Sequence, residues 1–345
     1  MNPFRKVSRL PTTKKLLDDA FSRAMKTKRP KGNMPAIKKY RIHEQGRIST
    51  AVNVLRARIN KIVKEFPSIE NMNPFYVDLL ELNAGVDKTK LALGRLQGSI
   101  SALESIEEQI NLKMQFAENP KQLEQLRKEA FGRISSVIEQ LKPEIKFLSK
   151  VRMKMRQIPD FDPHMPCIVV AGAPNAGKSS FVRLASTGKP EIGTYPFTTR
   201  NLVFGHRDIG FIKAQFVDTP GLLDRPMEKR NKIEKQALIA LKRISDIILF
   251  LYDPSDYASI SLEEQNRLFN EIKDFFDESR LVIAYNKMDL LSQDAKEKLQ
   301  EEKPDAYFLS TETREGIDTL LSDLEQQIKD LIKTSKFRGE ITAFN

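Results

Sequence analysis

The sequence contains a single cysteine, Cys167, among 345 residues. One thiol can form neither an internal disulfide nor a cysteine-based zinc ribbon, so the disulfide-rich secreted class and that class of metal site are both excluded. Long apolar runs are absent as well. The longest, Ile247–Tyr252, is far shorter than the ~18 residues of a membrane-spanning helix, and the basic N-terminus lacks the apolar core of a signal peptide. We therefore expect a cytoplasmic protein with no stable membrane association.

Positive charge is gathered at one end of the chain. The formal net charge is +11, and residues 1–50 carry 14 of the 57 lysines and arginines but 3 of the 46 acidic residues. The remainder of the chain is therefore neutral. Concentrated positive charge attracts polyanions, of which nucleic acid is the commonest, so we expect this segment to contact RNA. The alternative is a solvated, partly disordered basic arm with no dedicated ligand.

Apolar residues recur every three or four positions in three stretches of the N-terminal half, at 47–66, 93–114 and 123–141. This spacing predicts three long helices that pack together. Pro120 is well placed to start the third helix, and Pro143 should kink or end it.

The pattern changes at 157–166, where closely spaced prolines predict a linker. Downstream, short apolar runs alternate with helical stretches, which predicts a mostly parallel sheet with helices on both faces. The predicted strands are Cys167–Ala171, Phe211–Val217, Ile247–Tyr252, Leu281–Tyr285 and Ala306–Leu309. A further strand, Asn201–Gly205, is expected to pair antiparallel with Phe211–Val217, with His206–Asp208 as the turn between them. The predicted helices cover 178–186, 229–243, 261–277, 292–301 and 315–334. The expected organisation is an all-α basic helical domain (1–156), the linker, an α/β P-loop domain (167–335) and a tail (336–345).

A phosphate-binding pattern, G-x-x-x-x-G-K-[ST], spans Gly172–Ser179 directly after the first predicted strand of this domain and at the start of a helix. Glycines let backbone N–H groups curl around phosphate oxygens, and the helix N-terminus adds its positive dipole end. Lys178 is expected to reach the outer phosphates and Ser179 to bind Mg²⁺. The expected phosphate-binding residues are Gly172, Pro174, Asn175, Ala176, Gly177, Lys178, Ser179 and Ser180.

The tetrapeptide Asp218–Gly221 ends a buried strand on the ligand edge of the predicted sheet, a position that favours function over a plain turn. Asp218 can hold Mg²⁺ through water, and the Gly221 N–H can face the terminal phosphate. Between these motifs lies Tyr195–Arg200, where a threonine can bind Mg²⁺ and sense the γ-phosphate. Spacing does not decide between Thr198 and Thr199.

Asn286–Asp289 follows another predicted strand and supplies selectivity for the base. Asp289 can accept both N1–H and N2–H of guanine, while adenine would leave that carboxylate unpaired. Asn286 is expected to reach N7, and the Lys287 stem to cover the ring. Ser310, Thr311 and Glu312 end the next strand and can place a backbone N–H on guanine O6. A surface turn is the alternative for each motif alone, but several such motifs in order at strand ends predict a guanine nucleotide site.

Leu222 stands where many GTPases have a glutamine that orients the attacking water. A leucine neither donates nor accepts, so intrinsic hydrolysis should be slow unless a partner's arginine or a cation such as K⁺ supplies charge. Asn175 can help to hold K⁺, or it can simply shape the loop. Arg225 and Arg230 are expected to be ion-paired or to face a partner.

These residues resemble the Nog family of GTPases, the nucleolar GTP-binding proteins and their archaeal relatives in the Obg-like branch. The resemblance is carried by Pro174–Asn175, Tyr195–Thr199, Asp218–Arg225 and Arg230–Ala237, and in the helical half by Pro74–Tyr76, Asp78–Leu79 and Lys90–Gly94. It implies a GTP-hydrolysing switch that uses Mg²⁺ and binds the large ribosomal subunit or its precursor, both rRNA and ribosomal proteins. It also favours Thr199 as the Mg²⁺ ligand. The residues expected to act in hydrolysis are Lys178, Thr199, Gly221 and Asn175.

The sequence departs from the family's pattern in places. Eukaryotic members continue beyond the position of Asn345, so contacts made through that region are not carried over, and Ala176 and Thr311 stand where relatives often have valine and alanine. We expect a monomer. An alternative function is a regulatory switch whose helical domain binds a protein rather than RNA. A component of an RNA-modification enzyme would need a further catalytic centre, and the three histidines lie in unrelated contexts.

Overall fold

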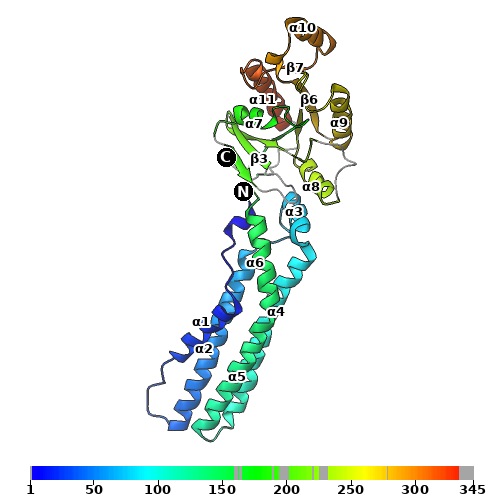
Figure 1. The fold of residues 1–345 in the computed structure, drawn as a ribbon. Coiled ribbons are helices and arrows are strands. Elements are labelled where there is room, and N and C mark those ends of the chain that lie inside the picture. The colour runs from blue at the N-terminus through cyan, green and yellow to red at the C-terminus, as the bar shows by residue number, and fades with distance from the viewer. Residues whose placement is uncertain are drawn as a thin grey trace. The chain divides into compact units, whose positions relative to one another are not determined.

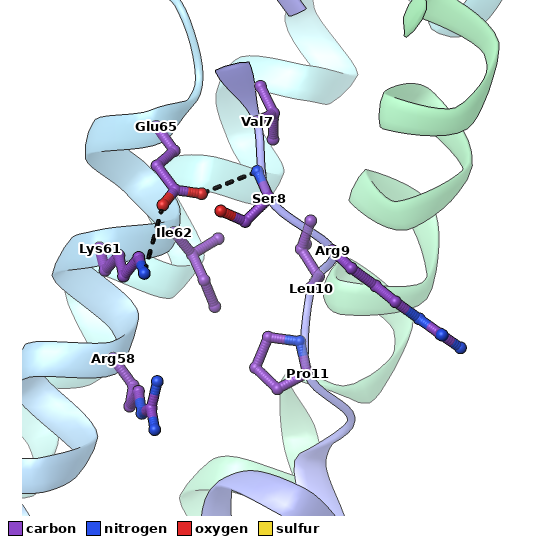
Figure 2. A pocket seen from close by; sticks show the side chains of 9 residues that line it. All are labelled: Val7, Ser8, Arg9, Leu10, Pro11, Arg58, Lys61, Ile62 and Glu65. Carbon is purple, nitrogen blue, oxygen red and sulfur yellow. Dashed lines mark hydrogen bonds and ion pairs between the residues drawn. The ribbon is translucent and has the colours of Figure 1, made fainter. Parts of the chain in front are cut away.

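The computed structural model describes residues 2–158, 162, 165–188, 190–193, 202–219, 221–224, 232–277 and 279–333. The chain divides into two compact units (Figure 1). The helical unit consists of residues 3–72 and 83–156, and the α/β unit of residues 1–2, 73–82 and 157–345. Thr198 and Thr199, Arg225 and Arg230, and most of the 157–166 linker lie outside the described residues.

Long helices form the helical unit, and α1, α2, α4 and α5 pack side by side (Figure 1). The elements are η1 (Pro3–Lys6), α1 (Thr13–Met25), α2 (Ala36–Glu65), α4 (Val86–Gln115), α5 (Pro120–Gln140) and α6 (Lys142–Arg156). The three predicted apolar stripes lie in α2, α4 and α5, and their residues form the core. Pro120 is the first residue of α5, with the Asn119 side chain accepting from the Gln122 N–H at 2.9 Å. α5 ends before Pro143, as predicted, and α6 is a separate helix.

The basic N-terminal segment is folded onto this core rather than extended as a disordered arm. Thr12 caps α1 by accepting a hydrogen bond from the Lys15 N–H at 3.2 Å. Apolar side chains from residues 2–25 are buried, namely Phe4, Val7, Leu10, Leu16, Ala20 and Ala24. The lysines and arginines between 5 and 38 remain exposed. Burying one face of α1 while its cations stay in water accounts for a charged segment that is nevertheless ordered.

A buried ion cluster ties α1, α2 and α5 together. Glu44, which is 2% exposed, accepts from Arg47 at 2.8 Å and lies 2.7 Å from Nε of Arg127. The Arg127 guanidinium lies 5.3 Å above the Phe131 ring, which stacks on Phe21 with ring centroids 4.4 Å apart. Since one buried carboxylate is shared by two guanidinium groups, replacing it takes a close negative charge away from both.

We expect Glu44→Gln to lower the free energy of opening of α2 and α5 by about 3–5 kcal/mol, because the change keeps the side-chain volume and removes the buried negative charge. Hydrogen exchange followed by mass spectrometry on peptides from these helices measures this free energy of opening. Glu104→Gln is the matched control, since Glu104 pairs with Arg56 at 3.1 Å on the surface and should contribute no more than about 1 kcal/mol. Equal effects of the two substitutions would contradict the prediction.

In the described part of the α/β unit, the sheet has seven strands in the order β2-β3-β4-β1-β5-β6-β7. The strands are β1 (Cys167–Gly172), β2 (Glu191–Gly193), β3 (Leu202–Ile209), β4 (Ile212–Asp218), β5 (Ile247–Tyr252), β6 (Arg280–Tyr285) and β7 (Tyr307–Phe308). β3 pairs antiparallel with both β2 and β4, and the pairs among β4, β1, β5, β6 and β7 are parallel. The mostly parallel sheet and the antiparallel pairing of the second strand were both predicted.

The turn between β3 and β4 was placed wrongly by the sequence. β3 runs on through His206–Asp208 to Ile209, which pairs with Ile212. The turn falls at Gly210, whose φ of 62° is left-handed, and at Phe211, whose side chain is fully exposed. Phe211 is apolar, so the pattern assigned it to the strand although its side chain has no core to enter.

Helices lie on both faces of the sheet. The described α-helices of the α/β unit are α3 (Pro74–Ala84), α7 (Lys178–Ala185), α8 (Lys232–Lys242), α9 (Leu262–Phe275), α10 (Gln293–Glu302) and α11 (Ile317–Lys333), of which α10 buries no residue. α7 and α11 bury Phe181 and Leu320 in one core cluster with Val170 of β1. On the other face Phe269 of α9 meets Phe250 of β5, with ring centroids 5.2 Å apart.

The chain leaves the helical unit after α2, contributes α3 to the α/β unit and then returns for α4. Within the α/β unit, Asp78 of α3 pairs with Arg243 at 2.6 Å, at the C-terminal end of α8. Phe75 and Tyr76 are buried edge-to-face, with centroids 5.1 Å apart. No apolar stripe signalled this placement in the sequence.

Parallel pairing brings the carboxyl ends of β1, β4, β5, β6 and β7 to one edge of the sheet. The loops that carry the predicted motifs follow these strands, so they meet at that edge. Among the described residues, no helix is long and apolar enough to cross a membrane. The same residues contain no group of three or more His, Cys, Asp or Glu side chains placed to hold a metal ion.

Candidate nucleotide-binding site

The loop between β1 and α7 is shaped by two glycines with left-handed or strained backbone. Gly172 has φ 138° and Gly177 has φ 95°. A Cβ at Gly172 would overlap the Leu251 carbonyl oxygen, and one at Gly177 would overlap the Asn286 amide. Only glycine allows these approaches. Asn175 is left-handed as well, with φ 61°, a conformation that asparagine tolerates better than most residues.

Lys178 lies at the start of α7 with its side chain folded over this loop. The residue is 6% exposed, and Nζ donates to the carbonyl oxygens of Gly172 at 2.9 Å and Ala173 at 2.6 Å. A cavity of about 310 Å³ opens here, lined by Pro174, Asn175, Gly177, Lys178, Ser179, Ser180 and Asp224. An ammonium group and the N-terminus of a helix at one cavity make a cradle for a phosphate chain.

Ser179 and Asp218 are brought together as expected for a magnesium site. The Ser179 hydroxyl donates to Oδ2 of Asp218. Asp218 is fully buried, and its other oxygen, Oδ1, has no hydrogen-bond partner in the described part of the chain. Burial raises the pKa of Asp218, against the opposing effects of the Ser179 hydrogen bond and the nearby Lys178 charge. Mg²⁺ prefers oxygen ligands and keeps water in its shell, so a hydroxyl beside a buried carboxylate oxygen fits it.

The segment after Asp218 differs from expectation in one hydrogen bond. Gly221, with φ 79°, donates its N–H to Oδ2 of Asp224 at 2.8 Å, so that N–H is engaged within the loop. Asp224 is 9% exposed and lines the phosphate cavity, and the sequence analysis did not single it out. Leu222 is fully buried, so its side chain is turned into the core.

Asn286 braces two loops of the site. Its amide is fully buried, with Nδ2 donating to the Ala176 carbonyl at 2.8 Å and to the Thr311 hydroxyl at 3.2 Å. Its Oδ1 accepts the Thr311 N–H at 2.9 Å. The sequence pattern predicted that this amide reaches guanine N7. In the structure both donors and the acceptor are used to join the phosphate loop to the loop after β7.

The loop after β7 is folded around Ser310. The buried Ser310 hydroxyl accepts from the N–H groups of Glu312 at 3.2 Å and Thr313 at 3.0 Å. The N–H groups of Thr311 and Glu312, expected near guanine O6, therefore both have partners inside the protein. These bonds hold the loop in a defined turn at the edge of the site.

Lys287 and Asp289 present different groups on the same loop. Lys287 has φ 63°, and its Nζ lies 2.5 Å from Oδ2 of Asp253, a residue that the sequence analysis missed. Asp289 lies on the short helix η3 (Met288–Leu290) and is exposed. Its carboxylate makes no ion pair or hydrogen bond with other described residues. Two unengaged oxygens can accept the paired N1–H and N2–H donors of guanine.

Two family models match the chain. The N-terminal helical domain of NOG1 matches residues 4–162, and nucleolar GTP-binding protein 1 (NOG1) matches residues 232–289. A crystal structure of nucleolar GTP-binding protein 1 from Plasmodium falciparum, 33% identical, covers 54% of this chain and 98% of its own, with a TM-score of 0.43.

Full-length relatives match across most of the sequence. An uncharacterised protein of Methanocaldococcus jannaschii is 34% identical over 85% of this chain and 83% of its own length. Nucleolar GTP-binding protein 1 of Encephalitozoon cuniculi is 32% identical over 99% of this chain, which spans 65% of that protein. The Drosophila melanogaster protein of the same name is 32% identical over 90% of this chain, which spans 49% of it. With its helical domain followed by a GTPase domain, the chain belongs to the nucleolar GTP-binding protein 1 family.

Proposed function

We propose that the chain is a GTP-hydrolysing switch that binds GTP and GDP with Mg²⁺ and acts as a monomeric cytoplasmic factor in assembly of the large ribosomal subunit. The observation that carries the proposal is the meeting, at one sheet edge, of the phosphate cradle, the Ser179–Asp218 pair and the unengaged Asp289 carboxylate. These supply the three parts that a magnesium–guanine nucleotide complex requires. RNA contact is assigned to the helical unit.

Base selectivity follows from Asp289. A carboxylate accepts hydrogen bonds and donates none, and guanine offers two adjacent donors where adenine offers none at these positions. An adenine nucleotide would leave the carboxylate facing the ring without a donor, and sites that depend on such pairing reject the analogue strongly. The Asn286 brace supports this role by holding the neighbouring loops in place.

Slow intrinsic hydrolysis follows from the groups around the terminal phosphate. Ser179 and Asp218 would hold Mg²⁺, the first directly and the second through water, and the ion would supply positive charge to the phosphates. Thr199 is proposed as the second protein ligand. The buried Leu222 side chain offers no polar atom to the attacking water. The rate of GTP hydrolysis therefore depends on positive charge supplied by a partner or a cation.

Asn175 is the residue that we assign to a monovalent cation. Its Nδ2 donates to the Ser259 hydroxyl at 3.1 Å. Oδ1 of the same amide is the oxygen that a K⁺ ion would seek. An ordered oxygen in the phosphate loop supports the proposal that K⁺ assists hydrolysis.

One end of the helical unit has the charge and the aromatic exposure that RNA requires. Figure 1 places the loop between α1 and α2 beside the turn between α4 and α5, and Arg41 of α2 donates to the Ala117 carbonyl of that turn at 3.2 Å. Exposed lysines surround it, namely Lys26, Lys28, Lys31, Lys38 and Lys121. Phe116, at the end of α4, is 83% exposed. Cations can neutralise phosphates while an exposed ring stacks on an unpaired base.

Asp289→Asn should reverse the base preference. We expect GDP affinity to fall by about a hundredfold or more, since two charge-assisted hydrogen bonds are lost, while xanthosine diphosphate gains because the new amide can donate to its 2-oxo group. Isothermal calorimetry with both nucleotides and Mg²⁺ measures this. Retained guanine selectivity would show that another residue reads the base.

Hydrolysis should be faster in K⁺ than in Na⁺ by at least about tenfold, because an added positive charge stabilises the transition state. Phosphate release in single-turnover experiments at equal ionic strength measures the rate. Asn175→Ala should remove the difference in hydrolysis rate between K⁺ and Na⁺. The affinity of this variant for GDP should be the same in both salts. Identical rates in K⁺ and Na⁺ would eliminate the cation site.

Binding to large ribosomal subunits should be tighter with a non-hydrolysable GTP analogue than with GDP, and it should depend on the basic end of the helical unit. We expect the triple substitution Lys28→Glu, Lys31→Glu and Lys38→Glu to weaken binding and to lower the slope of log K against log salt by about 2–3. Co-sedimentation over a range of salt concentrations measures both quantities.

The matched control replaces three exposed lysines of the α/β unit, Lys298, Lys303 and Lys329, with glutamate. It changes net charge equally and should leave subunit binding nearly intact. Equal binding in the GTP and GDP states would contradict the switch. Binding from lysate that survives nuclease treatment would favour a protein partner instead of RNA.

A further inference from the structure

Asp253 is a buried carboxylate of the α/β unit with a role outside the recognised motifs. It follows β5 directly and is 1% exposed. Its Oδ2 lies 2.5 Å from the Lys287 ammonium, while its Oδ1 accepts from both the N–H of Ser255 at 3.1 Å and the Ser255 hydroxyl at 2.6 Å. Both oxygens are thus engaged, one within its own loop and one across to the loop after β6.

The main chain of Asp253 is fixed independently by α9. Gln265, which is fully buried, accepts the Asp253 N–H through Oε1 at 2.9 Å and donates from Nε2 to the Asp253 carbonyl at 2.8 Å. The Gln265 amide also donates to the Ile260 carbonyl at 3.2 Å, closing the loop between β5 and α9. The carboxylate is therefore held by a helix and a turn, and it cannot follow Lys287 if that side chain moves.

Lys287 is the more exposed partner in this pair. Its side chain is 23% exposed, against 1% for Asp253. A lysine stem has several rotatable bonds, so ordering it costs conformational entropy. Lys287 has a left-handed φ of 63°, which sets the direction in which its side chain leaves the backbone. The ion pair with Asp253 holds the ammonium at the other end of that side chain. Asp289, the residue expected to pair with the base, follows Lys287 by two positions in the same loop.

We propose that Asp253 is a positioning residue for the base, holding the Lys287 stem in the conformation in which it covers the purine ring. The inference rests on the proposed guanine nucleotide function. Because the stem is ordered before the nucleotide arrives, binding does not have to order it. Asp253 contacts neither base nor phosphate in this arrangement, so its effect should be equal for GDP and for GTP analogues.

The test measures affinity for GDP and for a non-hydrolysable GTP analogue by calorimetry on the full chain with Mg²⁺. Asp253→Asn keeps the acceptor for Ser255 and turns an amide donor toward the Lys287 ammonium, which releases the lysine. We expect both nucleotides to bind about tenfold more weakly, in line with the loss of one charge-assisted hydrogen bond. In a Lys287→Met background, which retains an apolar stem, Asp253→Asn should cause less than a twofold further loss.

Asp256→Asn is the matched control, because Asp256 is exposed on the same loop and the substitution removes the same charge. It should leave affinity unchanged. The inference would be overturned if Asp253→Asn bound the nucleotides within twofold of the affinity of the unsubstituted protein. It would also be overturned if Asp253→Asn reduced affinity equally with and without Lys287, because Asp253 would then act by folding its own loop. If Asp253→Asn does not fold, Asp253→Glu replaces it, with a smaller loss expected that also disappears in the Lys287→Met background. Failure of the unsubstituted chain to bind guanine nucleotides would instead refute the proposed function.

Discussion

One buried amide, that of Asn286, holds the candidate site together. Its three hydrogen bonds join the phosphate loop at Ala176 to the loop after β7 at Thr311. The contact requires glycine at 177, where a Cβ would overlap the amide. Parallel pairing of the strands brings the loops to one edge, but pairing fixes only where each loop begins. The Asn286 hydrogen bonds fix their spacing, and an unpaired amide at this depth would be costly.

The sequence predicted those parts of the site whose chemistry demands a residue type at a fixed spacing. The glycines of the phosphate loop, Lys178 and Ser179 fall in this class, because backbone curvature and phosphate charge leave little choice. Asp253 was missed because its role depends on Lys287, which is far away in the chain. Asp224 was missed because it joins the site only where the loop after β4 meets the phosphate cavity. Asn286 was recognised, but its partners were not, since an amide in a sequence does not reveal which groups will face it. Likewise, nothing in the local pattern showed that α3 belongs to the α/β unit.

Positively charged side chains of the helical unit lie in two environments, the core and the surface. Arginines 47 and 127 enter the core because a planar guanidinium can pair with Glu44 and stack on Phe131 at the same time. The lysines and arginines between 5 and 38 stay exposed, and the ion pair of Lys15 with Asp19 at 2.9 Å lies at the surface. The burial of Phe4, Leu16 and Ala24 orders this segment beneath them. The lysines of α1 are thus presented on a folded helix, which lowers the entropy lost when a polyanion binds.

Three braces surround the proposed nucleotide, namely Asn286 between two loops, Asp253 on Lys287, and Ser179 on Asp218. Each one stabilises a conformation that exists before binding. In contrast, the segment that would face the attacking water buries Leu222 and directs the Gly221 N–H to Asp224. Pre-organisation is therefore concentrated on the groups that hold the nucleotide, and it is weak where hydrolysis must be accelerated. Under the proposed function, a site built this way keeps its nucleotide state until an outside group or cation changes the rate, which is the property that a timed assembly step requires.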